Sequence, residues 1–376
     1  MPLKLAIAAM LMAGSSAADP AFKTQFNHYA GSDGIVVSSP YAAGELELDD
    51  RTKVALRYTL DAVSGSSFNY SQSKTHLADP ARGAGSCKSC HGGLDAISGA
   101  TRNYGDVRHD LNFGVTRRVG ETDLKPGYIR SQENDYLSET FSFGLEQNLF
   151  SRDTTWSLGV RHLSDIISPT WNKHATQNLT TLGASLGLTQ VLGRFTVLKA
   201  GADYADAQGF QSNPYAFVQV AGLTSIPYPE RHPDEKQRLD LSAAFKQALP
   251  WDSSAELGYR YYQDSWDVRG QTFDLGLAKR LGFMTVEAAW RNYSQTQAYF
   301  FKNFYSVPET YMSRDLKLAD FRTDLYSLSL RGELGGGWST ELRYSKMSRQ
   351  DSLDYRLYFA DRPVDADLYV IGFTLQ

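Results

Sequence analysis

The sequence has little cysteine, no long apolar run and no large excess of charge of one sign. Two cysteines among 376 residues exclude a small disulfide-rich scaffold. No run of 18 apolar residues occurs, which excludes a membrane-spanning helix. The 38 Lys and Arg against 42 Asp and Glu give a net charge of −4, which excludes a basic nucleic-acid-binding surface as the main feature. No G-x-S-x-G motif stands at a predicted strand-to-helix turn, so no hydrolase site is expected.

Aromatic residues and glycine are abundant instead. The chain holds 22 Tyr, 19 Phe, 6 Trp and 31 Gly, while its hydrophobic fraction is a moderate 42%. Aromatic side chains are favoured on pleated, half-buried surfaces. The composition therefore indicates an all-β chain.

The first residues have the features of an export signal. Residues 1–18 read MPLKLAIAAMLMAGSSAA, with Lys4 before an apolar stretch that is too short to span a bilayer. Ser16 and Ala18 occupy the positions expected before a cleavage site. We therefore expect residues 1–18 to be a signal peptide and residues 19–376 to form an exported chain, in which cysteine chemistry takes place in an oxidising compartment.

Apolar and polar residues alternate with period two through most of residues 19–376. In the segment 255–262, one face carries Ala, Leu, Tyr and Tyr, and the other carries Glu, Gly, Arg and Tyr. A transmembrane β-barrel requires this alternation, because one face of each strand meets lipid and the other meets a wet lumen. The pattern predicts an all-β transmembrane barrel.

Sixteen strands can be assigned, the even number that single-chain bacterial barrels have. Short connections follow the even strands and the long ones follow odd strands, which predicts periplasmic turns and extracellular loops. We expect a barrel in the outer membrane of a Gram-negative bacterium, in contact with its lipid. The predicted strands are 22–31, 35–49, 53–64, 102–119, 124–134, 136–150, 154–167, 178–192, 195–209, 237–249, 253–266, 269–281, 284–298, 321–334, 338–349 and 364–375. The predicted long loops are 65–101, 168–177, 210–236, 299–320 and 350–363.

Charged residues of both signs fall on the predicted lumen face. They could form a constriction that selects solutes, or an ion-pair network that closes the lumen and stiffens the wall. The balance of signs favours the network. The predicted lumen-lining residues are Arg57, Asp61, Asp106, Arg108, Asp110, Glu256, Arg260, Glu287, Arg291, Arg331, Glu333, Glu341 and Arg343.

The two cysteines stand in one motif, Cys87-Lys88-Ser89-Cys90-His91. This is the C-x-x-C-H pattern of covalent haem c attachment, in which two thiols form thioethers with haem and the histidine is the proximal iron ligand. Export favours this interpretation, since c-type maturation takes place outside the cytoplasm. A disulfide between Cys87 and Cys90, redox-active or structural, and a structural metal site are the alternatives.

The motif lies in the predicted loop 65–101, so a haem there would sit on the surface or fold into the barrel mouth. His76, in the same loop, is the nearest candidate for a distal iron ligand. Three further candidates lie in other long loops at the same end: His174, His232 and Met312. Each of these is a common surface residue type, and the second ligand stays open.

Five segments have recognisable patterns: DAVSGSS at 61–67, SNPY at 212–215, PERHP at 229–233, YRYYQDSW at 259–266 and RNYSQTQAYF at 291–300. Together they resemble a large family of Gram-negative proteins, domain of unknown function 3570. Asn292 and Ser66 depart from the usual residues of the family. The resemblance implies an outer-membrane barrel and supplies no function.

A single C-x-x-C-H motif on a barrel of this size also resembles fused cytochrome–porins, which place the haem segment before the first strand. The resulting hypothesis is a haem c barrel that takes part in electron transfer across the outer membrane, as a carrier or channel rather than an enzyme. One haem cannot cross an apolar core of roughly 30 Å, so the hypothesis requires multihaem cytochromes on the periplasmic or extracellular side. The alternative is a haem-free barrel with a Cys87–Cys90 disulfide, serving as a porin or transporter or as a sheath around another protein.

The haem hypothesis is tested by the absorption spectrum of protein purified from a host with c-type maturation. We expect a reduced α-band that survives denaturation, because thioether bonds are covalent, and haem staining on a denaturing gel. Cys87→Ala should abolish both. Protein without haem would contradict the hypothesis and leave the disulfide and metal interpretations.

Overall fold

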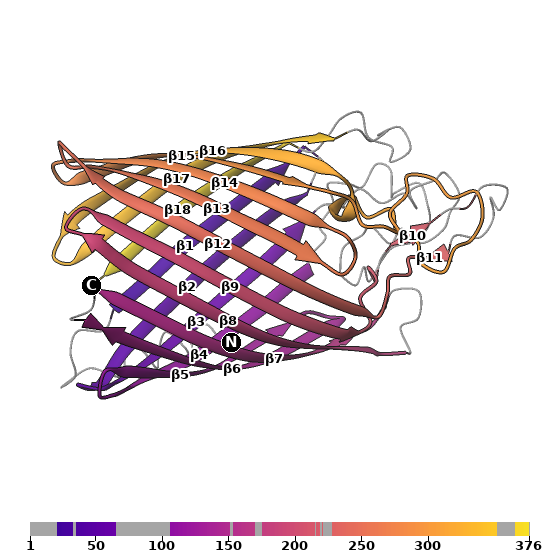
Figure 1. The fold of residues 1–376 in the computed structure, drawn as a ribbon, viewed down its shortest axis with the longest axis horizontal. Coiled ribbons are helices and arrows are strands. Elements are labelled where there is room, and N and C mark those ends of the chain that lie inside the picture. The colour runs from indigo at the N-terminus through magenta and orange to yellow at the C-terminus, as the bar shows by residue number, and fades with distance from the viewer. Residues whose placement is uncertain are drawn as a thin grey trace.

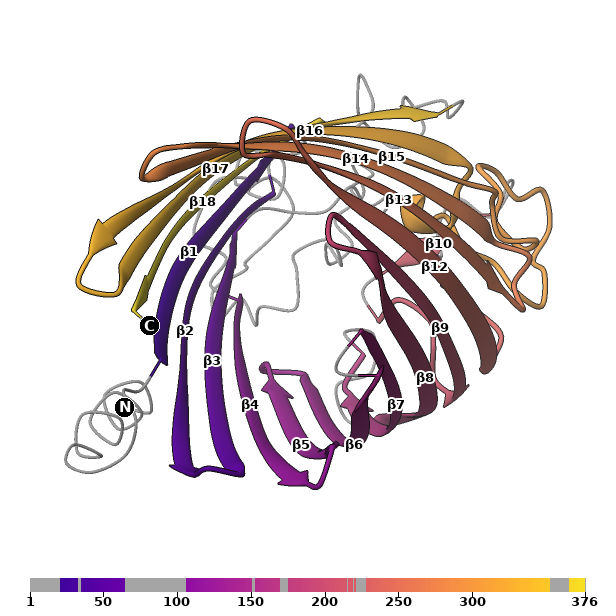
Figure 2. The ribbon, with the colours of Figure 1, turned by 60° about the vertical axis from the view of Figure 1, so that its left-hand side comes forward.

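The chain closes into one antiparallel barrel of sixteen strands (Figures 1 and 2). The computed structural model describes residues 21–32, 35–64, 106–150, 153–169, 175–214, 216–218, 220, 228–351 and 365–375. The expected signal peptide, residues 1–18, lies outside these ranges. The strands tilt strongly relative to the long axis, as barrel closure requires (Figure 1).

The barrel strands follow one another in sequence order around the wall. They are β1 (Ala21–Gly31), β2 (Val36–Asp49), β3 (Thr52–Ser64), β4 (Asp106–Val119), β5 (Thr122–Gln132), β6 (Tyr136–Leu149), β7 (Thr154–Ile167), β8 (Gln177–Gly193), β9 (Thr196–Gly209), β12 (Glu235–Leu249), β13 (Ser253–Asp264), β14 (Arg269–Leu281), β15 (Met284–Gln295), β16 (Phe321–Gly335), β17 (Trp338–Asp351) and β18 (Ala366–Leu375).

The first and last strands close the barrel. β1 pairs with β18 from Phe22 opposite Leu375 to Gly31 opposite Ala366. Each described barrel strand therefore has a hydrogen-bonded neighbour on both sides. A bilayer demands this, because an unpaired backbone group in the hydrocarbon core costs several kcal/mol.

The predicted fold class and the count of sixteen strands are confirmed. Several predicted strand ends differ from the observed ones by two or three residues. The predicted strands 124–134, 237–249, 338–349 and 364–375 are observed as Thr122–Gln132, Glu235–Leu249, Trp338–Asp351 and Ala366–Leu375, and the predicted strands 253–266 and 284–298 extend too far. β13 stops at Asp264 because that carboxylate accepts hydrogen bonds from the backbone of the following turn. β15 stops at Gln295, whose side chain donates to two backbone carbonyls of the next loop.

The loops contain structure that alternation did not predict. Two short strands, β10 (Phe217–Val218) and β11 (Tyr228–Pro229), pair in the loop between β9 and β12. A single-turn 3₁₀ helix, η2 (Leu316–Leu318), lies in the loop between β15 and β16. These segments gather at one end of the barrel, opposite the short turns (Figure 1). The predicted separation of short turns from long loops is thus observed.

The strands keep a strict division between their two faces. On β15, Val286, Ala288 and Trp290 alternate with Glu287, Ala289 and Arg291. The face that carries Val286, Ala288 and Trp290 is the outer one. Large exposed hydrophobic residues recur on this outer face throughout the wall, as a lipid-facing surface requires. They include Leu182, Leu186, Leu188, Leu257, Phe273, Leu275, Leu277, Leu328, Leu342, Ile371 and Phe373. Within the described ranges, no helix has the length and apolarity needed to cross a bilayer.

The division is tested at two adjacent alanines of β15. Ala288 is exposed opposite Leu277 and Leu328, whereas Ala289 lines a cavity inside the barrel. We expect Ala288→Arg to lower the free energy of unfolding from lipid vesicles by about 2–4 kcal/mol, because it places a charge in hydrocarbon. Ala289→Arg, the matched control, should be tolerated. Urea titration followed by gel mobility of the folded barrel measures both, and equal losses would contradict the assigned faces.

Candidate functional site

The inner face of the barrel carries arginine–carboxylate pairs. Arg161 on β7 donates from Nη1 and Nη2 to the two carboxylate oxygens of Asp203 on β9, at 2.9 and 2.6 Å. The arginine crosses β8 at Gly183, where an added Cβ would lie 2.7 Å from Arg161 Nε. Any larger residue at this position would force the Arg161 side chain to move from its observed path. The two side chains are exposed to similar extents.

Two further pairs continue the row across neighbouring strands. Arg260 on β13 donates from Nε to both oxygens of Asp240 on β12, at 2.7 and 2.6 Å, and also from Nη2. Arg291 on β15 donates from Nε to Asp274 Oδ1 on β14 at 2.6 Å and from Nη2 to Oδ2 at 3.4 Å. Charge-assisted bidentate contacts of this kind fix the orientation of the guanidinium group.

In most of these pairs the arginine is the more exposed partner. The Arg260 side chain is 57% exposed and that of Asp240 is 17% exposed. The Arg331 side chain is 63% exposed and that of Glu341 is 18% exposed. At these pairs the lumen therefore meets guanidinium groups, with the carboxylates less exposed. The same order holds for Arg108–Glu133, Arg118–Asp123, Arg291–Asp274 and Arg343–Glu341. Asp203 and Glu333 are exceptions, each slightly more exposed than its arginine.

Two cavities lie on the wall formed by β12 to β17. The turn-side cavity, of about 560 Å³, is lined by small residues of these strands together with charged ones, among them Glu256, Glu287, Arg331 and Arg343. The loop-side cavity, of about 480 Å³, is lined by Arg260, Tyr262, Tyr293 and residues nearer the long loops. Asp274 and Arg291 line both cavities, so this ion pair stands at the boundary between them.

The helix η2 bounds the loop-side cavity at the loop end, through Lys317 and Leu318. Two inward residues hold this turn in place. Gln295 Nε2 donates to Lys317 O and Ala319 O at 2.9 and 2.8 Å, and Arg349 Nη2 donates to Leu316 O at 2.8 Å. Asp315 caps the turn by accepting from the Lys317 backbone. The loop between β15 and β16 is thus anchored to the inner wall.

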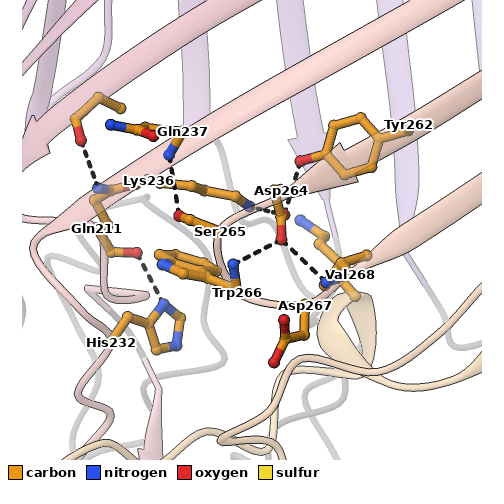
Figure 3. A network of polar contacts seen from close by, with 12 residues as sticks. Gln211, His232, Lys236, Gln237, Tyr262, Asp264, Ser265, Trp266, Asp267 and Val268 are labelled. Atoms are coloured by element: carbon orange, nitrogen blue, oxygen red, sulfur yellow. Dashed lines mark hydrogen bonds and ion pairs between the residues drawn. The ribbon is translucent and has the colours of Figure 1, made fainter.

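Asp264 joins the barrel wall to the loops (Figure 3). Its Oδ1 accepts from the backbone N–H groups of Trp266 and Val268, at 2.9 and 3.1 Å. Its Oδ2 accepts from Tyr262 Oη at 2.8 Å and lies 3.0 Å from Lys236 Nζ, which also stacks over the Trp266 ring. The side chain is almost fully buried, and these donors satisfy both of its oxygens.

Trp266 connects the turn held by Asp264 to the long loops. Its ring packs edge-on against His232 and Phe300, from the two long loops that flank β12 to β15. A second loop core contains Val218, Val220, Tyr305 and Met312. Burial there raises the pKa of Tyr305 to about 12, so its hydroxyl keeps its proton and donates to Phe300 O and Ser313 O.

The described loop residues proposed as iron ligands are engaged within the protein. His232 is buried, with Nδ1 2.9 Å from Gln211 O and Nε2 3.3 Å from Glu230 Oε2. Within the described residues, Nδ1 thus has a hydrogen-bond partner, whereas Nε2 faces the Glu230 carboxylate without forming a hydrogen bond. Met312 is buried, and its Sδ accepts from the Glu309 backbone at 3.3 Å. The other residues of the haem hypothesis lie outside the described residues: Cys87, Cys90, His91, His76 and His174.

The charged residues predicted to line the lumen share the parity of the inner face. Asp61 stands opposite Arg108, and Asp106 begins β4 opposite Val63. Arg57 lies over the Tyr41 ring, and Glu333 pairs with Arg280. Glu256 approaches Lys246 at 3.7 Å. Asp110 stands opposite Thr59 on β3.

Sequence reasoning missed the carboxylate partners. Asp203, Asp240 and Asp274 hold three of the arginine pairs, yet none was among the predicted lumen residues. The same alternation could have identified them, since each shares the inward parity of its strand. It could not show which arginine each one holds, because the pairing depends on strand register.

The apolar outer face, the charged inner face and the closure of the wall define a β-barrel of the outer-membrane type. The chain belongs to the family described as "Protein of unknown function (DUF3570)", which matches residues 3–177 and 169–354. The family resemblance read from the sequence is thereby confirmed. No curated protein matches the chain.

Solved structures show the same fold at low sequence identity. A bacterial polysaccharide outer membrane secretin superposes with a TM-score of 0.53 at 9% identity, covering 96% of this chain and 99% of that one. CdiB from Acinetobacter baumannii gives a TM-score of 0.53 at 10% identity, covering 96% of this chain and 61% of that one. At these identities the similarity establishes the barrel architecture alone.

The role of Asp264 is tested by Asp264→Asn, which puts an amide donor beside Lys236. We expect the turn after β13 to lose about 1.5–3 kcal/mol of local stability, since a hydrogen-bonded buried carboxylate is removed. Hydrogen exchange at Trp266 and Val268 should accelerate accordingly. Asp267→Asn is the control, because Asp267 is exposed with φ of 67°, a conformation that asparagine tolerates. Equal acceleration in both variants would contradict the role of Asp264.

Proposed function

We propose that the protein is an outer-membrane barrel of a Gram-negative bacterium through which hydrophilic solutes pass. A closed wall of sixteen strands is wide enough to enclose water when nothing fills it. The charged inner face is suited to a wet lumen and the apolar outer face to lipid.

This proposal rests on one observation: the ion pairs of the described strands run along the wall and not across the lumen. Among the described strands, the charged pairs lie within one strand or join strands one or two positions apart along the wall. Arg260–Asp240 and Arg291–Asp274 link direct neighbours, and Arg280–Glu333 spans only β15. The sequence favoured a network that closes the lumen, but these pairs of the described strands run along the wall and do not cross the lumen.

Conductance in a planar lipid bilayer tests the proposal. We expect stepwise ion conductance from the purified barrel. Ala289→Trp should lower the single-channel conductance because it fills space inside the barrel, whereas Ala288→Trp should not, because it adds an aromatic ring on the lipid side. A folded barrel that carries no current would contradict the proposal and favour a sheath around another protein.

A haem-carrying electron-transfer barrel is the second candidate, and the Cys87-x-x-Cys90-His91 motif supports it. It requires haem c, multihaem cytochromes as partners and a distal ligand. His76 remains the proposed distal ligand, because it lies in the same predicted loop as the motif. The two candidates are compatible, because the motif lies in a predicted loop and not on the strands that line the two cavities.

A further inference from the structure

The formal charges of the inner face are nearly balanced, but the exposed charges are not. At the loop-side cavity, Arg260 and Arg291 are each 57% exposed, whereas Asp240 and Asp274 are 17% and 35% exposed. The arginine side chain is longer than aspartate, so its head reaches the lumen while the carboxylate stays near the strand. A solute at this wall therefore meets cations first.

The residues that line the loop-side cavity also carry more positive than negative charge. Its charged residues are Lys236, Arg260, Arg291 and Lys317 against Asp264 and Asp274. Asp264 is buried and neutralises Lys236 at 3.0 Å. Arg260, Arg291 and Lys317 remain as the exposed cations of this cavity, with the less exposed Asp240 and Asp274 paired to the two arginines.

The two arginines also keep hydrogen-bonding capacity. Each uses Nε and Nη2 to hold its aspartate. Among the described residues, the Nη1 group of each arginine has no protein acceptor in these pairs. A guanidinium donor of this kind matches the oxygens of carboxylate and phosphate.

Two tyrosines of the cavity can accept hydrogen bonds from the hydroxyl groups of a solute that carries a carboxylate or phosphate. Tyr262 Oη donates to Asp264, and Tyr293 Oη donates to Gln295 at 2.7 Å. Their lone pairs are then left as acceptors for hydroxyl groups. The cavity thus combines two guanidinium donors with two phenolic acceptors in about 480 Å³, which is within the size range of small-molecule sites.

We propose that the loop-side cavity is a binding site for small organic anions that carry a carboxylate or phosphate group, with Arg260 and Arg291 as its specificity-determining residues. The inference rests on the proposed function, since the solute must enter the lumen. It assigns that function a substrate class: hydroxylated anions are preferred over neutral sugars and over cations.

Liposomes containing the purified full-length chain test the preference with three solutes of one skeleton: glucose, gluconate and glucose 6-phosphate. We expect at least one anion to enter faster than glucose, on the order of tenfold at low salt, because a lumen lined by one sign concentrates counter-ions. The ratio of gluconate to glucose 6-phosphate shows which oxyanion the site prefers. The preference should shrink at high salt.

Substitutions assign the preference to the two arginines. Arg260→Gln with Arg291→Gln should bring the anions down to the rate of glucose, and Arg260→Lys with Arg291→Lys should retain most of the preference, which separates loss of charge from loss of structure. Arg118→Gln is the control, because Arg118 on β4 is an exposed lumen arginine that lines neither cavity.

The outcomes distinguish this inference from the proposed function. A barrel that admits glucose as fast as both anions, or whose preference survives the double glutamine variant, overturns the anion site and leaves solute passage intact. A folded barrel that admits no solute and carries no current overturns the proposed function, and the anion site with it.

Discussion

The bilayer imposes the constraint on which the rest of the structure depends. Lipid accepts neither unpaired backbone groups nor exposed charge, so the wall must close and its charged residues must turn inward. Closure is achieved by pairing β1 with β18. Inward charge then needs partners, and the register of neighbouring strands supplies them at Arg260–Asp240 and Arg291–Asp274.

Pairing on a concave wall has a consequence that charge counting does not reveal. The carboxylate of an aspartate stays close to its strand, while the arginine that reaches over it ends in the lumen. A wall with balanced charges can therefore present cations, as the exposures of Arg331 and Glu341 show. Small neighbours permit this arrangement, and Gly183 beneath Arg161 is the clearest case.

The barrel could be predicted from the sequence because its determinants are local. Period-two alternation assigned the sixteen strands, and turn lengths separated the two ends. The loop structure could not be predicted, because it depends on contacts distant in sequence. Trp266 packs against both His232 and Phe300, and Gln295 ends β15 by holding η2. Period-two alternation carries no signal for such contacts, nor for the choice of Asp240 as the partner of Arg260.

The central claim is that the inner face around β15 is wet and presents positive charge. Ala289→Cys, in a background with Cys87→Ala and Cys90→Ala, tests it through the reaction rates of two water-soluble thiol reagents of one scaffold, one ending in sulfonate and one in trimethylammonium. The account predicts that both reagents react and that the sulfonate reacts faster, while a cysteine at Ala288 in lipid reacts with neither. An unreactive cysteine at position 289, or faster reaction with the cation, would contradict it.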